Sequence, residues 1–193
     1  MAIDTPIATR IRVEDYHTMI ADGRLTTDDR VELLDGQIVA KMPQNPPHAR
    51  AISRVTRLTM AAIIHHPEWM VQSQVPITLD TSEPEPDLII IMAPDERYEH
   101  RHPGSTEVAL VVEVADSSLD QDQDRKQAIY AQAGLPVYWI INLNESYVEV
   151  YTQPVQTPTP HYHLIERFRA GDMLPLMLAG VEVGRLNVRD LLP

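Results

Sequence analysis

One glutamate lies within the most apolar stretch of the chain. Glu113 belongs to the run Ala109–Ala115, whose other members are all aliphatic. Such a run is typical of a strand buried on both faces. An isolated carboxylate at that position is costly unless it pairs with a cation or binds a metal ion. The sequence leaves two interpretations open: a strand-end carboxylate paired with an arginine, or a metal ligand.

A second carboxylate begins another apolar run. Asp87 follows Pro86 and precedes Leu88–Met92, which we predict to be a strand. Two carboxylates at strand ends of one sheet can converge on a cation, and Mg²⁺ typically takes only one or two protein carboxylates. Asp87 alone is equally consistent with ordinary turn chemistry, because aspartate is common in turns.

A lysine completes the candidate group. Asp122, Lys126 and Tyr130 recur at i, i+4 and i+8, so they form one stripe of a helix predicted over residues 119–133. The spacing favours a surface pair between Asp122 and Lys126, worth only about 0.3–0.5 kcal/mol. The alternative is that Lys126 reaches over the sheet towards Glu113. Small Ala115, on the strand face of Glu113, would leave room for it.

The elements around these residues predict a mixed α/β fold. Apolar runs predict buried strands over 107–115 and 137–142, and the helix over 119–133 between them stops at Gly134. This strand–helix–strand order favours a βαβ unit with parallel strands. We therefore expect one central sheet, flanked by helices, that contains these two strands and the strand 88–92.

The N-terminal part predicts a hairpin extension and two helices. Val31–Leu34 and Gln37–Ala40 flank Asp35-Gly36, a strong two-residue hairpin signal. Helices are predicted over Val13–Ala21 and over His48–Ile64. The remaining predictions are an extended Met70–Leu79, a polar loop 94–106, a strand Tyr147–Gln153, a loop 153–160 and a tail of strands ending in a short helix near Asp190. The length suits one domain, 1–193, with its core at about 31–153.

The charge of the chain is unusual for a protein that acts on nucleic acid. The formal net charge is -12, whereas phosphate binding usually relies on a basic surface. Two arginine groups, Arg50/Arg54/Arg57 and Arg97/Arg101, could form a local basic rim. Scattered, solvated arginines are an equally good interpretation.

Composition excludes several classes of site. The chain has no cysteine, so disulfides, thiolate catalysis and thiolate metal sites are excluded. Eight histidines are present, but the chain has no His-Glu-x-x-His motif, so we do not expect a zinc site. The N-terminus does not resemble a signal peptide, and no apolar run is long enough to span a bilayer. We expect a cytoplasmic protein without a membrane segment.

An ordered set of motifs resembles one known family. Glu113–Ser118, Asp122–Gly134 and Tyr138–Asn142 are similar to the Uma-two (Uma2) family of restriction endonucleases, within the PD-(D/E)XK nuclease superfamily. The resemblance runs from about Val13 to Tyr151. Earlier segments that agree with it are the hairpin Val31–Gly36, the helix start Pro47-His48 and the strand start Pro86-Asp87.

The resemblance implies a restriction-endonuclease-like fold and a set of site residues. It makes Glu32, Asp87 and Glu113 active-site acids and Lys126 the catalytic lysine. In the wider superfamily the lysine lies two residues after the glutamate, where this chain has Ala115, so the role would pass to Lys126. Two further departures are Asp116, where the family usually has serine, and Asn142, where it usually has aspartate.

The predicted function is that of a metal-dependent endonuclease acting on DNA. Asp87 and Glu113 would hold Mg²⁺ or Mn²⁺, and Lys126 would orient or activate the attacking water. The alternative is a non-catalytic nucleic-acid-binding or regulatory domain that keeps the nuclease fold, which the acidic charge favours. Cutting both strands of a duplex needs two sites, so we expect a homodimer, with Met173–Val183 as one possible contact surface.

Overall fold

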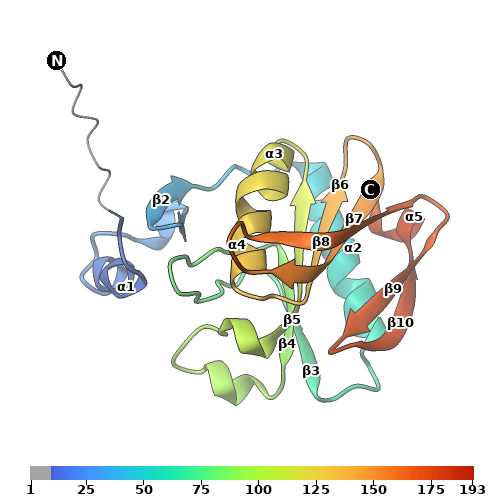
Figure 1. Ribbon diagram of the computed structural model, residues 1–193, viewed down its shortest axis with the longest axis horizontal. Helices are drawn as coiled ribbons and strands as arrows, with labels where there is room; N and C mark the ends of the chain where they lie inside the picture. The colour runs from blue at the N-terminus through green and yellow to red at the C-terminus, as the bar shows by residue number, and fades with distance from the viewer. Residues whose placement is uncertain (1–9) are drawn as a thin grey trace.

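A six-stranded mixed sheet forms the centre of the computed structural model, which describes residues 10–193 (Figure 1). Its strand order is β3-β4-β5-β6-β7-β8. Neighbouring strands are antiparallel except β5 and β6, which are parallel. The strands are β3 (Trp69–Gln72), β4 (Leu88–Met92), β5 (Val108–Ala115), β6 (Val137–Asn142), β7 (Tyr147–Val155) and β8 (His161–Arg169). The predicted α/β class, the central sheet that contains β4, β5 and β6, and the parallel pair of β5 and β6 are confirmed.

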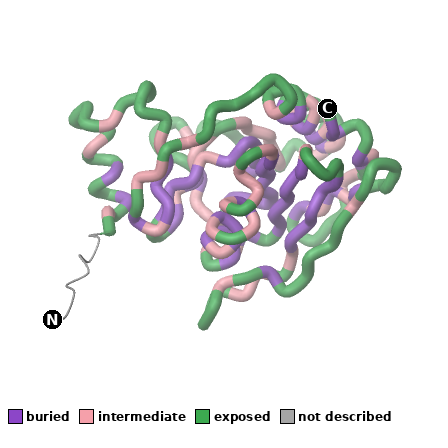
Figure 2. Tube along the Cα trace, turned by 90° about the horizontal axis from the view of Figure 1, so that it is seen from above, coloured by how far each residue is buried: buried purple, intermediate pink, exposed green. Residues whose placement is uncertain are grey.

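Both faces of β5 are covered, which explains its aliphatic sequence. Alternate residues of the strand enter two separate apolar clusters: Val112 and Val114 pack with helix α2 (Pro46–Ala62), whereas Val111 and Ala115 pack with α4 (Gln127–Gln132). Figure 1 shows α4 on one side of the sheet and α2 on the other. Figure 2 shows buried positions running through the strands of the sheet while the outer loops are exposed. Glu113 therefore lies on the face that α4 covers.

The connection between β5 and β6 differs from the single predicted helix. It consists of α3 (Leu119–Gln121), a π-helical segment labelled η4 (Asp122–Lys126) and α4. In the π segment the Gln127 N–H donates to the Asp122 carbonyl, five residues back. The Tyr138 hydroxyl, from β6, donates to the same carbonyl at 3.2 Å. A side chain that enters the helical ladder in this way is a known cause of local widening.

The predicted N-terminal elements are confirmed. Helix α1 spans Val13–Ala21, and η1 (Thr27–Asp29) leads into the antiparallel hairpin of β1 (Val31–Leu34) and β2 (Gln37–Ala40). Both turn residues have positive φ, 48° at Asp35 and 71° at Gly36, as a tight two-residue hairpin requires. Backbone bonds between Leu33 and Glu83 then fix the hairpin beside the segment that leads into β4.

Two loop predictions differ from the structure. Of the extended segment predicted at 70–79, only β3 is a strand, and residues 73–86 form an irregular connection, because Pro76 cannot donate to a sheet ladder. The polar loop 94–106 contains two short 3-10 helices, η2 (Asp95–Tyr98) and η3 (Ser105–Glu107).

The C-terminal segment folds back onto helix α2. β9 (Met173–Leu178) and β10 (Val181–Asn187) form an antiparallel hairpin, and α5 (Val188–Leu191) follows. Leu174, Leu176 and Leu178 are buried in the core cluster of α2. Much of the apolar segment expected to contact a second copy therefore serves the chain's own core. No helix in the described part of the chain is long and apolar enough to cross a membrane.

Candidate active site

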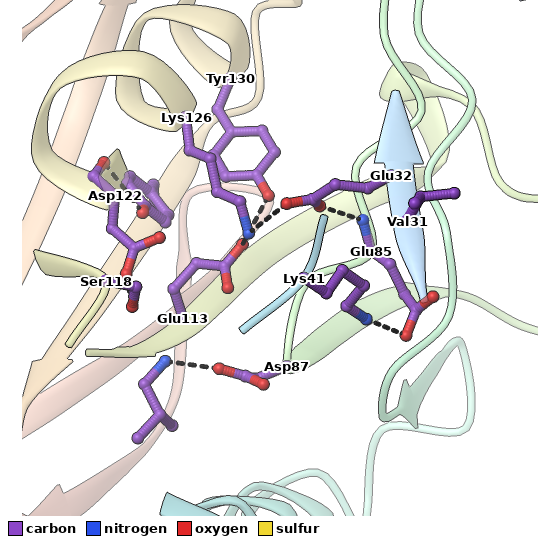
Figure 3. A network of polar contacts seen from close by, with 12 residues as sticks. Val31, Glu32, Lys41, Glu85, Asp87, Glu113, Ser118, Asp122, Lys126 and Tyr130 are labelled. Carbon is purple, nitrogen blue, oxygen red and sulfur yellow. Dashed lines mark hydrogen bonds and ion pairs between the residues drawn. The ribbon is translucent and has the colours of Figure 1, made fainter. Parts of the chain in front are cut away.

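The carboxylate of Glu113 and the ammonium group of Lys126 form a buried pair. The Lys126 Nζ donates to Glu113 Oε1 at 2.9 Å, and the Tyr130 hydroxyl donates to the same oxygen at 2.7 Å (Figure 3). Glu113 is 4% exposed and Lys126 7% exposed. The surface pair with Asp122, which the spacing favoured, is wrong for Lys126, because its side chain is buried and its ammonium group pairs with Glu113 and Glu32. The cation that faces Glu113 is also a lysine rather than an arginine.

Glu32 reaches the same group from the N-terminal hairpin. Its Oε1 lies 3.5 Å from Lys126 Nζ, and its Oε2 accepts a hydrogen bond from the Glu85 backbone N–H at 3.1 Å. β1 can deliver this side chain because its bonds to Glu83 place the hairpin against the loop before β4. Both oxygens of Glu32 therefore have protein partners, and the side chain is buried.

Asp87 lies beside Glu113 on the neighbouring strand. The antiparallel register pairs Leu88 with Val112, so one step further places Asp87 opposite Glu113. Its Oδ2 accepts a hydrogen bond from the Val114 N–H at 2.8 Å and lies 3.3 Å from the His48 Nε2. The structure thus brings all four sequence-predicted residues, from β1, the start of β4, β5 and the π segment, to one place (Figure 3).

An open pocket lies over this group. The four predicted residues line it together with Lys41, Glu85, His48, Ser118 and Asp122, among others. Sequence reasoning did not assign these five to the site. Asp122 is buried and its Oδ2 accepts a hydrogen bond from Ser118 Oγ at 2.7 Å. Asp122 could have been assigned from the sequence because it belongs to the same helical stripe as Lys126. His48 could have been assigned because the Pro47-His48 helix start is part of the resemblance.

Burial and the charge of Lys126 have the largest effects on the pKa values of the pocket's acids. Burial raises the pKa of Glu113 to about 8; Lys126 opposes the shift, and Asp122, Asp87 and Glu32 add to it. Burial likewise raises the pKa of Asp122 to about 6, again against Lys126. Burial alone would lower the pKa of Lys126, but Glu113, Glu32 and Asp122 outweigh it and raise that pKa. A charged lysine among several carboxylates is the result.

Asp87 and Glu113 each have one carboxylate oxygen that is free to bind a cation. Within the described residues, Glu113 Oε2 and Asp87 Oδ1 have no hydrogen-bond partner in the protein. Within residues 10–193, no group of three or more histidine, aspartate or glutamate side chains is arranged to hold a metal ion by itself. Mg²⁺ does not require one, since one or two carboxylates, water and substrate phosphate usually complete its shell. The donor set therefore fits Mg²⁺ or Mn²⁺.

Fold and site together define a nuclease-like α/β protein, and comparison with known proteins agrees. A family model described as "Putative restriction endonuclease" matches residues 13–189, and the chain belongs to this family, Uma2. Its fold is similar to that of a crystal structure from Anabaena variabilis ATCC 29413, titled a putative nuclease belonging to DUF820. The TM-score is 0.67 at 17% identity, over 94% of this chain and 97% of that one. No curated protein matches the chain. Family membership supports a nuclease, an enzyme that acts on phosphodiester bonds.

Proposed function

We propose that this protein is a magnesium-dependent endonuclease that hydrolyses phosphodiester bonds in DNA. The observation that carries the proposal is the pair of unpartnered oxygens, Glu113 Oε2 and Asp87 Oδ1, beside a buried, charged Lys126. Mg²⁺ or Mn²⁺ held by Asp87 and Glu113 would supply Lewis acidity and a bound water of lowered pKa.

The residues of the chain have separate roles in this proposal. Lys126 is kept charged by Glu113 and Glu32, so its ammonium group can orient the attacking water and offset phosphate charge. Glu32 positions that ammonium group from the opposite side, because its second oxygen is anchored to the Glu85 backbone. The Val114 N–H holds one Asp87 oxygen, which directs the other away from the strand.

The first experiment is a cleavage assay on supercoiled plasmid and on single-stranded DNA with the metal titrated. We expect cleavage that needs Mg²⁺ or Mn²⁺ and stops with a chelator. Asp87→Asn should weaken metal binding, measured by calorimetry, because one anionic ligand is lost while the shape is kept. Ser53→Ala, on an exposed position of α2, is a matched control for handling and folding. Metal-independent cleavage, or unchanged metal affinity in Asp87→Asn, would contradict the assignment.

A non-catalytic nucleic-acid-binding domain is the second candidate. The net charge of -12 and the placement of the lysine on a helix, with Ala115 at the strand position, favour it. Binding of DNA without cleavage, at any Mg²⁺ or Mn²⁺ concentration, would select this candidate over the enzyme.

We also propose a homodimer, since two sites are needed to cut both strands of a duplex. Three leucines of β9 are used in the core, whereas Met173 and Val181 are 47% and 60% exposed and could contact a second copy. Light scattering at high micromolar concentration should report twice the mass of the 21.8 kDa chain. A monomer under those conditions would rule the dimer out.

A further inference from the structure

We propose that helices α2 and α5 form a groove that binds the phosphodiester backbone of the nucleic acid outside the active-site pocket. This inference rests on the proposed function for the identity of the ligand. Its own evidence is a separate group of residues: Arg54, Arg57 and Leu58 from α2, with Arg189 from α5 and Leu192 just beyond it, line one groove.

Helix α2 has the opposite charge to the rest of the chain. Residues 36–67 contain no aspartate or glutamate, although the whole chain has 28 of them and a net charge of -12. Arg50, Arg54 and Arg57 all belong to α2. Asp190 is the single acidic residue that lines the groove. A polyanion repelled by most of the surface would meet a locally favourable potential here.

The arginines lie on one side of the helix. Arg50, Arg54 and Arg57 follow the spacing i, i+4 and i+7, which places them in a single stripe. The opposite side of α2 faces the core with its buried residues Ala51, Ile52, Val55 and Thr59. α5 packs against α2 and adds Arg189 to the same groove (Figure 1).

These guanidinium groups are available to a ligand. Several arginines elsewhere in the chain are neutralised: Arg101 binds Glu107 at 2.6 Å, and Arg167 binds Glu149 at 2.6 Å. Across residues 10–193, by contrast, Arg54, Arg57 and Arg189 form no ion pair with a carboxylate side chain. The sequence suggested two basic groups of equal standing, but the structure pairs Arg97 and Arg101 with Glu107 and leaves the α2 group free.

The groove and the active-site pocket lie at two places on helix α2. His48, in the first turn of α2, lines the pocket and lies 3.3 Å from Asp87. Arg54 and Arg57 follow six and nine residues later, and at 3.6 residues per turn both lie away from His48 around the helix, Arg57 on the opposite side. The groove is therefore a contact surface for the nucleic acid that is separate from the pocket.

The test measures DNA binding against salt, without cleavage. The full chain, with Ca²⁺ in place of Mg²⁺, is titrated onto a fluorescent duplex and anisotropy is read between about 0.05 and 0.3 M salt, with the duplex checked for integrity on a gel. Arg54→Ala/Arg57→Ala should lower the slope of log affinity against log salt by about 1.8, since each phosphate contact contributes about 0.9. The affinity at about 0.1 M salt should fall by roughly tenfold to a hundredfold.

Two further variants make the result specific. Arg12→Ala/Arg24→Ala removes the same charge from exposed arginines near α1, and it should leave affinity and slope nearly unchanged. Arg54→Lys/Arg57→Lys keeps the charge and should retain most of the binding. If the alanine pair at Arg54 and Arg57 behaves like the Arg12/Arg24 control, or if the wild-type chain binds no DNA, the inference is overturned.

Failure of this inference is distinguishable from failure of the proposed function. A wild-type chain that cuts DNA in Mg²⁺, yet whose Arg54/Arg57 variant binds normally, overturns the groove alone. A wild-type chain that does not cut in Mg²⁺, but whose binding depends on Arg54 and Arg57, supports the groove and overturns the endonuclease.

Discussion

Two buried glutamates lie in one row across the central sheet and make a controlled comparison. Glu113 on β5 and Glu149 on β7 are both register partners of Ile140 on β6. Each is 4% exposed, and each accepts a hydrogen bond from a tyrosine hydroxyl at 2.7 Å. Each also faces a cation, Lys126 at 2.9 Å and Arg167 at 2.6 Å respectively.

The two carboxylates differ in how their oxygens are used. Glu149 Oε1 accepts from Arg167, and its Oε2 accepts from Gln123 at 2.8 Å and from Tyr151, so both oxygens are satisfied. Burial alone would raise the pKa of Glu149, but these hydrogen bonds outweigh it and lower that pKa. Glu113 instead receives both of its donors on Oε1, and Oε2 is left towards the pocket.

The difference separates a structural ion pair from a candidate site. A buried carboxylate with both oxygens hydrogen-bonded to the protein stabilises the fold and has little left for a ligand. A buried carboxylate with one unpartnered oxygen, and with other carboxylates beside it, has a cost that a bound cation would relieve. The predictions below test whether Glu113 and Glu149 do differ in this way.

The largest expected difference is in cleavage when each cation is removed. Lys126→Ala should lower single-turnover DNA cleavage by about 10²–10³, the usual cost of losing a group that stabilises developing charge. Lys126→Met, which keeps the apolar stem, should lose as much while leaving metal binding by calorimetry nearly intact. Arg167→Ala should cleave at close to the wild-type rate, since its side chain is 45% exposed and far from the pocket lining. Wild-type cleavage in Lys126→Met would remove the lysine from the mechanism.

The second difference is in metal affinity when each carboxylate is neutralised. Glu113→Gln should weaken Mg²⁺ or Mn²⁺ binding by roughly 10–100-fold or more, judged from the size of losses even at outer-shell groups of metal sites. Glu149→Gln should leave that affinity unchanged. It should instead lower the free energy of unfolding by about 1–3 kcal/mol, because Arg167 and Gln123 lose a charged acceptor. Calorimetry and urea unfolding measure the two quantities, and equal metal affinities in both variants would erase the contrast.

The sequence predicted the fold of this region well because local pattern and tertiary burial agree there. The aliphatic run of β5 and the 137–142 run need two covered faces, and both are covered by helices. The π segment within 119–132 was not predictable, because the Tyr138 hydroxyl that contacts its Asp122 carbonyl comes from another strand. Periodicity within a helix contains no information on that contact.

The site was harder to predict from sequence than the fold. Glu113 was visible because a charge interrupts an apolar run, and Asp87 because it begins another. Lys126 was not, since the same i, i+4 spacing describes a surface pair, and only the depth of the helix against the sheet decides between them. Glu149 also interrupts an apolar stretch, Tyr147–Tyr151, so this pattern alone does not separate a structural glutamate from one in the candidate site.

The third difference is in the pH dependence of stability. The pKa of Glu113 is raised to about 8 in the folded state from an ordinary 4.5. A raised pKa means that the folded state holds the proton more tightly, so this contribution is fully present below pH 4.5 and is lost as pH rises towards 8. The lowered pKa of Glu149 has the opposite sign: its contribution is present above the ordinary pKa and is lost as pH falls.

Urea unfolding at several pH values measures both contributions. Relative to wild type, Glu113→Gln should become more stable between pH 5 and pH 8. Glu149→Gln should show a deficit that shrinks as the pH falls below about 4.5. Saturating Mg²⁺ should reduce the slope in the wild-type protein, because a cation on Glu113 favours the ionised carboxylate. Parallel pH profiles for the two variants would show that the glutamates titrate alike.

The smallest effects are expected when each of the two tyrosines is replaced by phenylalanine, since each variant loses only a hydroxyl group. Tyr151→Phe should cost about 1.5–3 kcal/mol of stability, the range for a bond to a charged group, and leave cleavage unchanged, because Glu149 keeps Gln123 and Arg167. Tyr130→Phe removes one of the two donors of Glu113 and should cost about 1.5–3 kcal/mol, the range for a bond to a charged group. It should also reduce cleavage several-fold, since Lys126 would then hold the Glu113 carboxylate without the second donor that fixes its orientation. Because phenylalanine keeps the ring packing, unfolding free energy and cleavage rate can be compared directly between the two variants. A stability loss in Tyr130→Phe with fully retained cleavage would show that its hydroxyl is structural, like that of Tyr151. The functional difference between the two glutamates would then depend only on Lys126 and on the free oxygen of Glu113.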